Sequence, residues 1–299
     1  MQVCLVTPTY GLDLERFKIQ RASVESFADE SITHVAVVPP EEYGLFRSAV
    51  NLDSRFTILT TDSLLPAHLE HQRRYGETRK RRFLKRRRDR KKSVPSGWWL
   101  QQAIKLAAPE ATNCENIVFL DSDAFLKAPL TASRFFDEQG RLHFYRGGWL
   151  DAETASWNID ALDFFEYEHQ GTPVERYIHC PMVARRAYLL EIREYCRSRM
   201  TEKDCSWIDV LWRYRIQSEY TLYGVYCEFV SPKSDIVAVE PEVCTQFWWP
   251  SDFSDFDRRF KDAIADVSRP FCLVQSNVGY SVERLKSLVA RHLPEVRLP

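Results

Sequence analysis

The sequence of 299 residues predicts an α/β fold, with a mixed, mainly parallel sheet flanked by helices. Short apolar runs alternate with segments of helical spacing through the first 60 residues, and the same alternation returns near residue 100. Strands separated by helices favour a parallel sheet with helices on its faces. Hydrophobic residues make up 44% of the chain, enough for a large core, which excludes a disordered or fibrous protein.

Each element of the first half follows from its pattern. An apolar run ending in Thr-Pro-Thr predicts the first strand, and two prolines end the second. Leu14, Phe17, Val24 and Phe27 share the spacing of one helix face. The expected strands are Gln2–Thr7, His34–Pro40, Phe56–Thr60 and Asn116–Leu120, and the expected helices are Leu12–Phe27, Glu41–Val50 and Gly97–Glu110.

The second half is less regular, yet the same reasoning assigns its elements. We expect strands at Arg141–Tyr145, Tyr177–Val183, Ile236–Val239 and Phe271–Gln275. We expect helices at Ala152–Tyr167, Arg185–Arg199, Ser206–Tyr214, Glu219–Phe229 and Val282–Leu293. Neither an internal repeat nor a clean linker is present, so one continuous domain over residues 1–299 is expected.

The net charge of −1 conceals a strong local imbalance. Residues 79–92 hold eleven of the 41 basic residues and one acid, which leaves the remainder of the chain near −11. Eight cysteines occur without a CxxC pair or a histidine partner at zinc-finger spacing, which argues against a structural zinc site. Several cysteines lie in apolar runs, as expected of a reduced cytoplasmic protein. The sequence has neither a signal-peptide pattern nor a run of membrane-spanning length.

The most informative motif is Asp121-Ser122-Asp123, directly after the apolar run IVFL. Ligands of open α/β sheets bind at the carboxyl ends of the strands, where these two carboxylates emerge. Two close carboxylates repel each other unless a cation or a proton intervenes. Mn²⁺ or Mg²⁺ accepts oxygen ligands and keeps positions open for phosphate. The motif therefore predicts a metal held by Asp121 and Asp123 that binds the diphosphate of a nucleotide-sugar.

Two other functions are compatible with parts of the sequence. A phosphatase of the haloacid-dehalogenase type also places Asp-x-Asp after a strand, but usually after the first strand and with Thr or Val where this chain has Phe125. A non-enzymatic protein could use the basic stretch 79–92 to bind nucleic acid or an anionic surface. We rank both below a transferase because the motif follows a later, buried strand.

The segments VTPTY, GWWLQQAIKL and FLDSDAFL resemble GT-A glycosyltransferases, and more narrowly a bacterial family of glycosyltransferase-like proteins whose shared domain has no known function. SEYTLYG and VQSN are similar to the same family. The resemblance implies a nucleotide-sugar donor half at 1–130 and an acceptor half at 131–299. It also implies a third metal ligand, often a histidine, from a C-terminal loop, where this chain instead has Gln275, Ser276 and Asn277. The polar, strongly basic segment 66–97 breaks the strand–helix rhythm and predicts an insertion, either without regular structure or as a helix rich in Arg and Lys.

The resemblance and the strand ends together define the candidate site residues. The donor-binding candidates are Thr7, Pro8, Thr9, Tyr10, Gln102, Lys105, Asp121, Ser122 and Asp123, and Gln101 lies beside them on the same helix. The acceptor-binding candidates are His179, Trp248 and Trp249. Of the adjacent tryptophans in each pair, 98–99 and 248–249, we expect at least one ring to face the core.

The catalytic candidates are two acids of the second half. Glu219 follows Ser218 at the start of an expected helix, where an acid also suits the first turn through the helix dipole. Asp209 lies among apolar and aromatic residues and needs a partner if it is buried. Either could deprotonate an acceptor hydroxyl.

The expected partners are a nucleotide-sugar and a saccharide or lipid-linked acceptor. The stretch 79–92 is the candidate for contact with a membrane surface or an anionic polymer, and it is equally compatible with a solvated loop. The expected location is the cytoplasm, with the inner membrane surface as a peripheral site.

Overall fold

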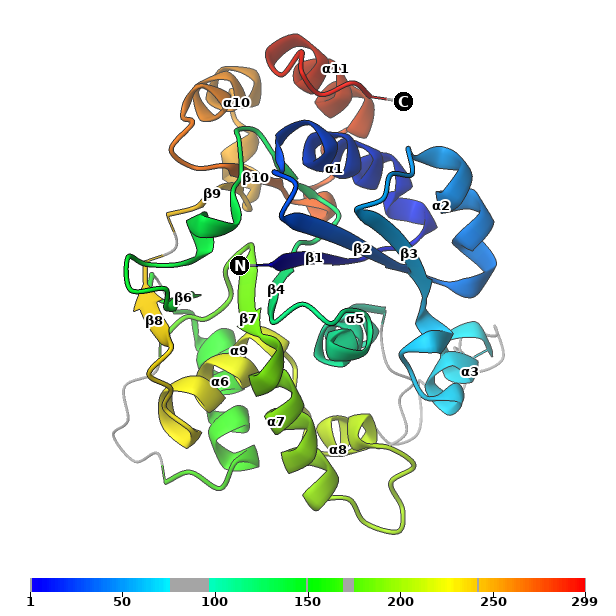
Figure 1. Ribbon diagram of the computed structural model, residues 1–299, viewed down its shortest axis with the longest axis vertical. Helices are drawn as coiled ribbons and strands as arrows, with labels where there is room; N and C mark the ends of the chain where they lie inside the picture. Colours follow the sequence, from blue (N-terminus) through cyan, green and yellow to red (C-terminus); the bar gives the residue numbers. More distant parts are fainter. Residues whose placement is uncertain (1, 76–96, 149, 169–174, 241, 299) are drawn as a thin grey trace.

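The computed structural model describes residues 2–75, 97–148, 150–168, 175–240 and 242–298. Its central sheet has five strands in the order β3-β2-β1-β4-β7, seen near the middle of Figure 1. These are β3 (Phe56–Thr60), β2 (Ile32–Val38), β1 (Val3–Pro8), β4 (Asn116–Phe119) and β7 (Met182–Arg185). The first four run parallel, and β7 is antiparallel to β4. The predicted mixed, mainly parallel sheet flanked by helices is confirmed.

Both faces of the sheet are buried, as the continuous apolar runs require. On one face, Val3 and Leu5 of β1 join a core that includes Val24 of α1 (Leu14–Phe27). On the other, Cys4 and Val6 join the core beneath α5 (Gly97–Ala107), α7 (Arg186–Ser198) and α9 (Glu219–Val225). Figure 1 shows α1 and α2 (Tyr43–Ala49) above the strands and α5 below them.

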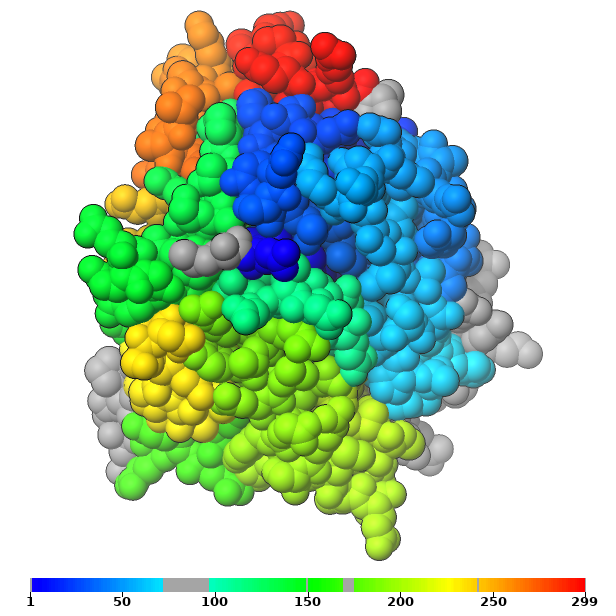
Figure 2. Space-filling view, in the orientation of Figure 1, coloured from blue at the N-terminus to red at the C-terminus, as the bar shows by residue number. Residues whose placement is uncertain are grey.

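Two small sheets extend the structure beside the central one. Strand β10 (Phe271–Val274) pairs with β5 (Ala124–Leu126) and β9 (Cys244–Phe247), while β6 (Leu142–Tyr145) pairs with β8 (Ile236–Val239). Helices α10 (Phe256–Ala265) and α11 (Val282–His292) lie at the end of the structure that holds β10, and α11 packs on α1. In Figure 2 this C-terminal part, orange and red, lies against the blue N-terminal part. Sequence patterns missed β5, β9 and α10.

Several boundaries differ from the sequence expectation. β7 begins at Met182 rather than Tyr177, because residues 177–180 form an irregular segment ahead of it. Helix α9 ends at Val225 and continues as a π-helical turn to Val230. Two other helices, α6 (Ala152–Phe164) and α8 (Trp207–Arg213), lie close to their expected ranges.

The expected insertion at 66–97 is only partly described. It begins with a helix, α3 (Ala67–Tyr75), but the basic stretch 79–92 lies outside the described residues. None of the helices in the described ranges is long and apolar enough to cross a membrane.

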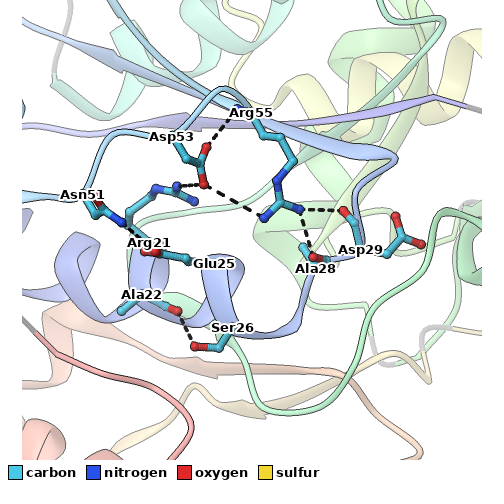
Figure 3. Close-up of polar contacts among 9 residues, drawn as sticks. All are labelled: Arg21, Ala22, Glu25, Ser26, Ala28, Asp29, Asn51, Asp53 and Arg55. Atoms are coloured by element: carbon cyan, nitrogen blue, oxygen red, sulfur yellow. Dashed lines mark hydrogen bonds and ion pairs between the residues drawn. The ribbon is translucent and has the colours of Figure 1, made fainter.

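Arg21 and Arg55 fasten α1 to the loop before β3. The Arg21 guanidinium lies 2.7 Å from Asp53 Oδ2 and 4.5 Å from the centre of the Phe56 ring. Arg55 donates to the backbone carbonyls of Ala28 and Asp29 just after α1, as Figure 3 shows. Burial acts to raise the pKa of Asp53, but the hydrogen bond and charge of Arg21 outweigh it and lower that pKa. The network holds the loop before the edge strand β3 against α1, the helix that also contacts the candidate site.

His34 on β2 makes the stability of the fold depend on pH. Its ring is buried, and burial lowers its pKa to about 3. The unfolded chain therefore binds a proton at His34 near pH 6.5 that the folded chain does not bind, so stability falls as pH decreases below 6.5. We expect this residue alone to remove about 2 kcal/mol between pH 8 and pH 5.

Urea unfolding at both pH values measures this loss. His34→Gln should reduce the pH dependence of the unfolding free energy by that amount, whatever its effect at pH 8. Leu12→Gln, at a position that is 88% exposed and carries no titratable group, is the control and should keep the pH dependence of the parent protein. Equal pH dependence in the parent and His34→Gln would contradict the assignment.

Candidate active site

Asp121-Ser122-Asp123 lies where the chain order of the sheet reverses. From β1 the chain builds β2 and β3 on one side and later adds β4 on the other. A crevice forms at such a switch point, outside the carboxyl ends of the strands, and is the usual ligand site of open α/β sheets. β4 ends at Phe119, and the motif follows between it and β5. The strand-end position predicted for the motif is thus the one observed.

The buried amide of Gln20 holds this segment in place. From α1, its Nε2 donates to the carbonyl oxygens of Asp121, at 2.6 Å, and Ala124, at 2.8 Å. Its Oε1 accepts a hydrogen bond from Thr7 Oγ1 at 2.9 Å. Thr7 also lies 3.1 Å from His34 Nε2 and is fully buried, so its side chain lies beneath the site rather than in it. Thr7 is therefore a supporting residue in this structure, not a lining one.

A cavity of about 580 Å³ opens over the motif. The first-strand loop contributes Pro8, Thr9 and Tyr10 to its wall, and the motif contributes all three of its residues. The opposite wall comes from α5 and from the loop after β10. The other polar or aromatic residues that line this large cavity are Asp13, Thr61, Trp98, Gln101, Trp248, Gln275, Ser276 and Asn277.

The carboxylate of Asp123 is the more buried of the pair. Its Oδ2 accepts a hydrogen bond from the backbone N–H of Ser276 at 3.0 Å, so the C-terminal loop reaches the motif through its main chain. Burial, and next the charge of Asp121, raise the pKa of Asp123 to about 7. Burial also raises the pKa of Asp13, another acid that lines the cavity. Three acids, Asp13, Asp121 and Asp123, therefore line the large cavity, and Asp123 is partly protonated near pH 7.

Asp121 is paired with a buried lysine. Lys105 Nζ lies 2.8 Å from Asp121 Oδ1 and 2.8 Å from Glu219 Oε1, and it sits 4.7 Å from the centre of the Tyr220 ring. Burial by itself lowers the pKa of Lys105, but the charges of Asp121 and Glu219 outweigh it and raise the pKa well above its usual range. Lys105 is therefore a fixed positive charge between two carboxylates, one facing the cavity and one inside the core.

A second cavity, of about 240 Å³, adjoins the first. Four residues line both cavities: Trp98, Gln101, Asp121 and Trp248. The predicted acceptor residues His179, Trp248 and Trp249 all line this small cavity, as do Gln102 and Lys105. Its remaining polar or aromatic lining is Asp151, Glu153, Thr154, Trp157, Arg176, Ser218 and Tyr220.

Two of the tryptophan rings that line the small cavity are exposed. Trp98 is 44% exposed and Trp249 52% exposed, whereas Trp99 is buried and donates through Nε1 to the Ile216 carbonyl. Trp248 packs against the core, so each adjacent pair places one ring inward, as predicted. His179 is buried, with Nε2 3.0 Å from the Arg176 carbonyl oxygen, and burial lowers its pKa to about 4. It is consequently neutral near pH 7.

The two predicted catalytic acids line neither cavity. Glu219 is fully buried on α9 and faces Lys105. Asp209 on α8 lies 2.8 Å from His68 of α3 and accepts a hydrogen bond from Ser206, so it has the partner that its apolar surroundings required. The geometry gives Glu219 a supporting position behind Lys105 and gives Asp209 a link between two helices.

Other residues of the site were missed from the sequence. Asp13 caps the start of α1, Gln20 lies in the middle of the same helix, and Asp151 and Trp157 belong to α6 and its cap. A glutamine on the apolar face of a predicted helix was the only available signal for Gln20. Helix α6 approaches α5 so that the ring centres of Trp157 and Trp98 lie 5.7 Å apart. No local sequence pattern predicts this contact.

The donor set at the motif suits a hard divalent cation bound together with a phosphate ligand. Asp121 and Asp123 both line the large cavity, and the contacts to the Asp121 carboxylate from Lys105 and Gln101 fall on Oδ1. Within the described ranges, no group of three or more His, Cys, Asp or Glu side chains could hold a metal ion. Mg²⁺ commonly binds through one or two carboxylates plus substrate phosphates rather than through an all-protein cage. The two carboxylates fit that pattern.

The profile of a family described as a family of unknown function (DUF6492) matches residues 1–296. The chain belongs to this family. No curated protein matches the sequence. Among solved structures, the chain is similar to the galactosyltransferase LgtC in complex with donor and acceptor sugar analogues, at 11% identity and a TM-score of 0.48, over 97% of this chain and 96% of that one. The chain is also similar to an active-site mutant of LgtC, at 11% identity and a TM-score of 0.48, over 96% of this chain and 95% of that one.

The Lys105–Glu219 pair should dominate the energetics of this region. Lys105→Met leaves Glu219 buried without a counterion, and we expect it to lower the unfolding free energy by about 3–5 kcal/mol. Adding Glu219→Gln removes the orphaned charge and should restore most of that loss. Urea unfolding at pH 7.5 measures both.

A matched control is Lys18→Met, because Lys18 pairs with Glu15 at 2.8 Å on the surface of α1. It should cost less than about 1 kcal/mol. If the double variant is as unstable as Lys105→Met alone, the two charges do not compensate each other in the core.

Proposed function

We propose that this protein is a glycosyltransferase that moves a sugar from a nucleotide-diphosphate sugar to a saccharide or lipid-linked acceptor. The observation that carries the proposal is the meeting of two cavities at Asp121, one rich in carboxylate and amide groups and one rich in exposed tryptophan. A transferase needs two adjoining substrate sites whose shared wall holds the reacting groups. The pair of aspartates at a strand-end switch point supports the same conclusion.

The large cavity suits the donor. Its volume of about 580 Å³ lies within the usual range for small-molecule sites. Tyr10 is 47% exposed at its rim and offers a flat ring, while Gln275, Ser276 and Asn277 offer hydrogen-bonding groups. A divalent cation, Mn²⁺ or Mg²⁺, held by Asp121 and Asp123 would stabilise the negative charge on the departing diphosphate. Lys105, which lines the small cavity, adds a fixed positive charge 2.8 Å from Asp121 Oδ1.

The small cavity suits the acceptor. Sugars present flat apolar faces, and the accessible rings of Trp98 and Trp249 offer complementary surfaces. Neutral His179 can exchange hydrogen bonds with a hydroxyl but does not supply charge near pH 7. Acids beside these rings can accept hydrogen bonds from sugar hydroxyls.

The group that deprotonates the acceptor must touch it. Apart from Asp121, the carboxylates that line the small cavity are Asp151 and Glu153. The hydrogen bond from the Thr154 N–H lowers the pKa of Asp151 and makes it a weaker base. Glu153, exposed on the first turn of α6, is therefore our preferred base, whereas catalytic roles for Glu219 and Asp209 remain sequence-based predictions.

Titration calorimetry with uridine, guanosine and cytidine diphosphates in the presence of Mn²⁺ tests the donor site. We expect one of them to bind, and Asp121→Asn and Asp123→Asn each to weaken that binding by at least about tenfold, because each replaces a charged carboxylate ligand of the metal by a neutral amide. Asp262→Asn, on the exposed face of α10, is the control and should bind like the parent protein.

The outcomes separate this proposal from its competitors. If none of the three diphosphates binds, the donor-site assignment fails. A trapped aspartyl-phosphate at Asp121 would instead favour a phosphatase. Salt-dependent binding of DNA or RNA that survives replacement of both aspartates would favour a nucleic-acid-binding protein.

A further inference from the structure

Asp121 already has a cation beside it in the free protein. The ammonium of Lys105 lies 2.8 Å from Oδ1, on the carboxylate assigned to the metal under the proposed function. Gln101 approaches the same oxygen, at 3.5 Å. The side chain of Asp121 is 27% exposed, whereas that of Lys105 is 2% exposed. The lysine thus contacts Asp121 from the protein interior and leaves the solvent side of the carboxylate accessible.

The position of this ammonium is strongly constrained. Glu219 lies 2.8 Å behind it with a side chain that is 0% exposed, and the Tyr220 hydroxyl lies 3.4 Å away. If Lys105 moved out towards solvent, it would leave Glu219 charged and unpaired in the core, which is strongly unfavourable. Glu219 is in this sense a positioning residue, since it reaches Asp121 only through Lys105.

We infer that Lys105, held by Glu219, is a built-in counterion that disfavours uptake of a divalent cation by Asp121 until a diphosphate is present. The inference rests on the proposed function and concerns the order in which the ligands enter. An ammonium and a dication sharing one carboxylate repel each other over a few ångströms in a partly desolvated site. The negative charges of a diphosphate attract both cations and remove that conflict.

The charges around the site support this order. Asp121 and Asp123, which both line the large cavity, supply the negative charge that would attract a metal. Lys105 cancels part of that attraction at Asp121. Glu219 does not restore it, because it lies on the far side of Lys105 and is nearer to the ammonium than to the cavity.

Manganese binding without and with a nucleotide tests the inference directly. Electron paramagnetic resonance measures free Mn²⁺ with the protein alone and with uridine, guanosine or cytidine diphosphate added. Each nucleotide with Mn²⁺ but without protein is the reference, because a diphosphate binds Mn²⁺ by itself. In the parent protein we expect weak binding of Mn²⁺ alone and binding at least about tenfold tighter with one diphosphate. The double variant Lys105→Met/Glu219→Gln removes the ammonium without leaving a buried charge, and it should bind Mn²⁺ alone about tenfold more tightly than the parent protein.

Two further variants sharpen the comparison. Lys105→Arg keeps a positive charge and should keep weak binding of Mn²⁺ alone. Lys18→Met removes a lysine paired with Glu15 outside both cavities and should behave like the parent protein. Circular dichroism of each variant establishes that it is folded before metal is added.

Each result has a distinct meaning. Equal affinity of the parent protein and the folded double variant for Mn²⁺ alone overturns the inference while leaving the proposed function intact. If the double variant does not fold, the parent protein still decides: a diphosphate that binds the protein without strengthening its binding of Mn²⁺ overturns the inference and leaves the proposed function intact. If no diphosphate binds the parent protein, the proposed function itself fails.

Discussion

The hydrogen bonds of one buried amide, that of Gln20, position the candidate active site. Through them α1 holds the end of β1, the carbonyl of Asp121 and the carbonyl of Ala124 at the start of β5. A buried amide that satisfies three groups is costly to disturb, because each unpaired partner would retain its desolvation penalty. The directions of Asp121 and Asp123 therefore depend on a helix that precedes them by a hundred residues. The Arg21 and Arg55 contacts hold that helix against the other edge of the sheet.

The sequence pattern within a single segment was sufficient to predict the buried strands of the central sheet. The apolar runs of β1, β2 and β4 are buried on both faces and can be recognised without knowing their neighbours. The location of Asp121 and Asp123 at a strand end followed from the IVFL run alone. Strand β5 was missed because it has only three residues, and β9 was missed because Thr245 and Gln246 interrupt its apolar run.

The roles of individual side chains were harder to predict, because they depend on distant partners. Lys105 and Glu219 are separated by more than a hundred residues, and no spacing rule links them. The dipole argument for Glu219 explained its place at the start of α9 but not that its carboxylate is fully buried. Asp209 was expected to need a partner, and its partner, His68, lies in the segment predicted as an insertion. Thr7 was expected to end the first strand, but β1 continues to Pro8, and strand alternation directs the Thr7 side chain inward.

One helix forms part of both cavities. Four lining residues of α5 stand at positions i, i+3, i+4 and i+7 and so project from one face of the helix. They are Trp98, Gln101, Gln102 and Lys105. Trp98 and Gln101 contact both spaces, while Gln102 and Lys105 face the smaller one. A substitution at Trp98 or Gln101 would therefore reshape both cavities at once, whereas substitutions on α6 or at Trp249 would reshape the small cavity and leave the large one untouched.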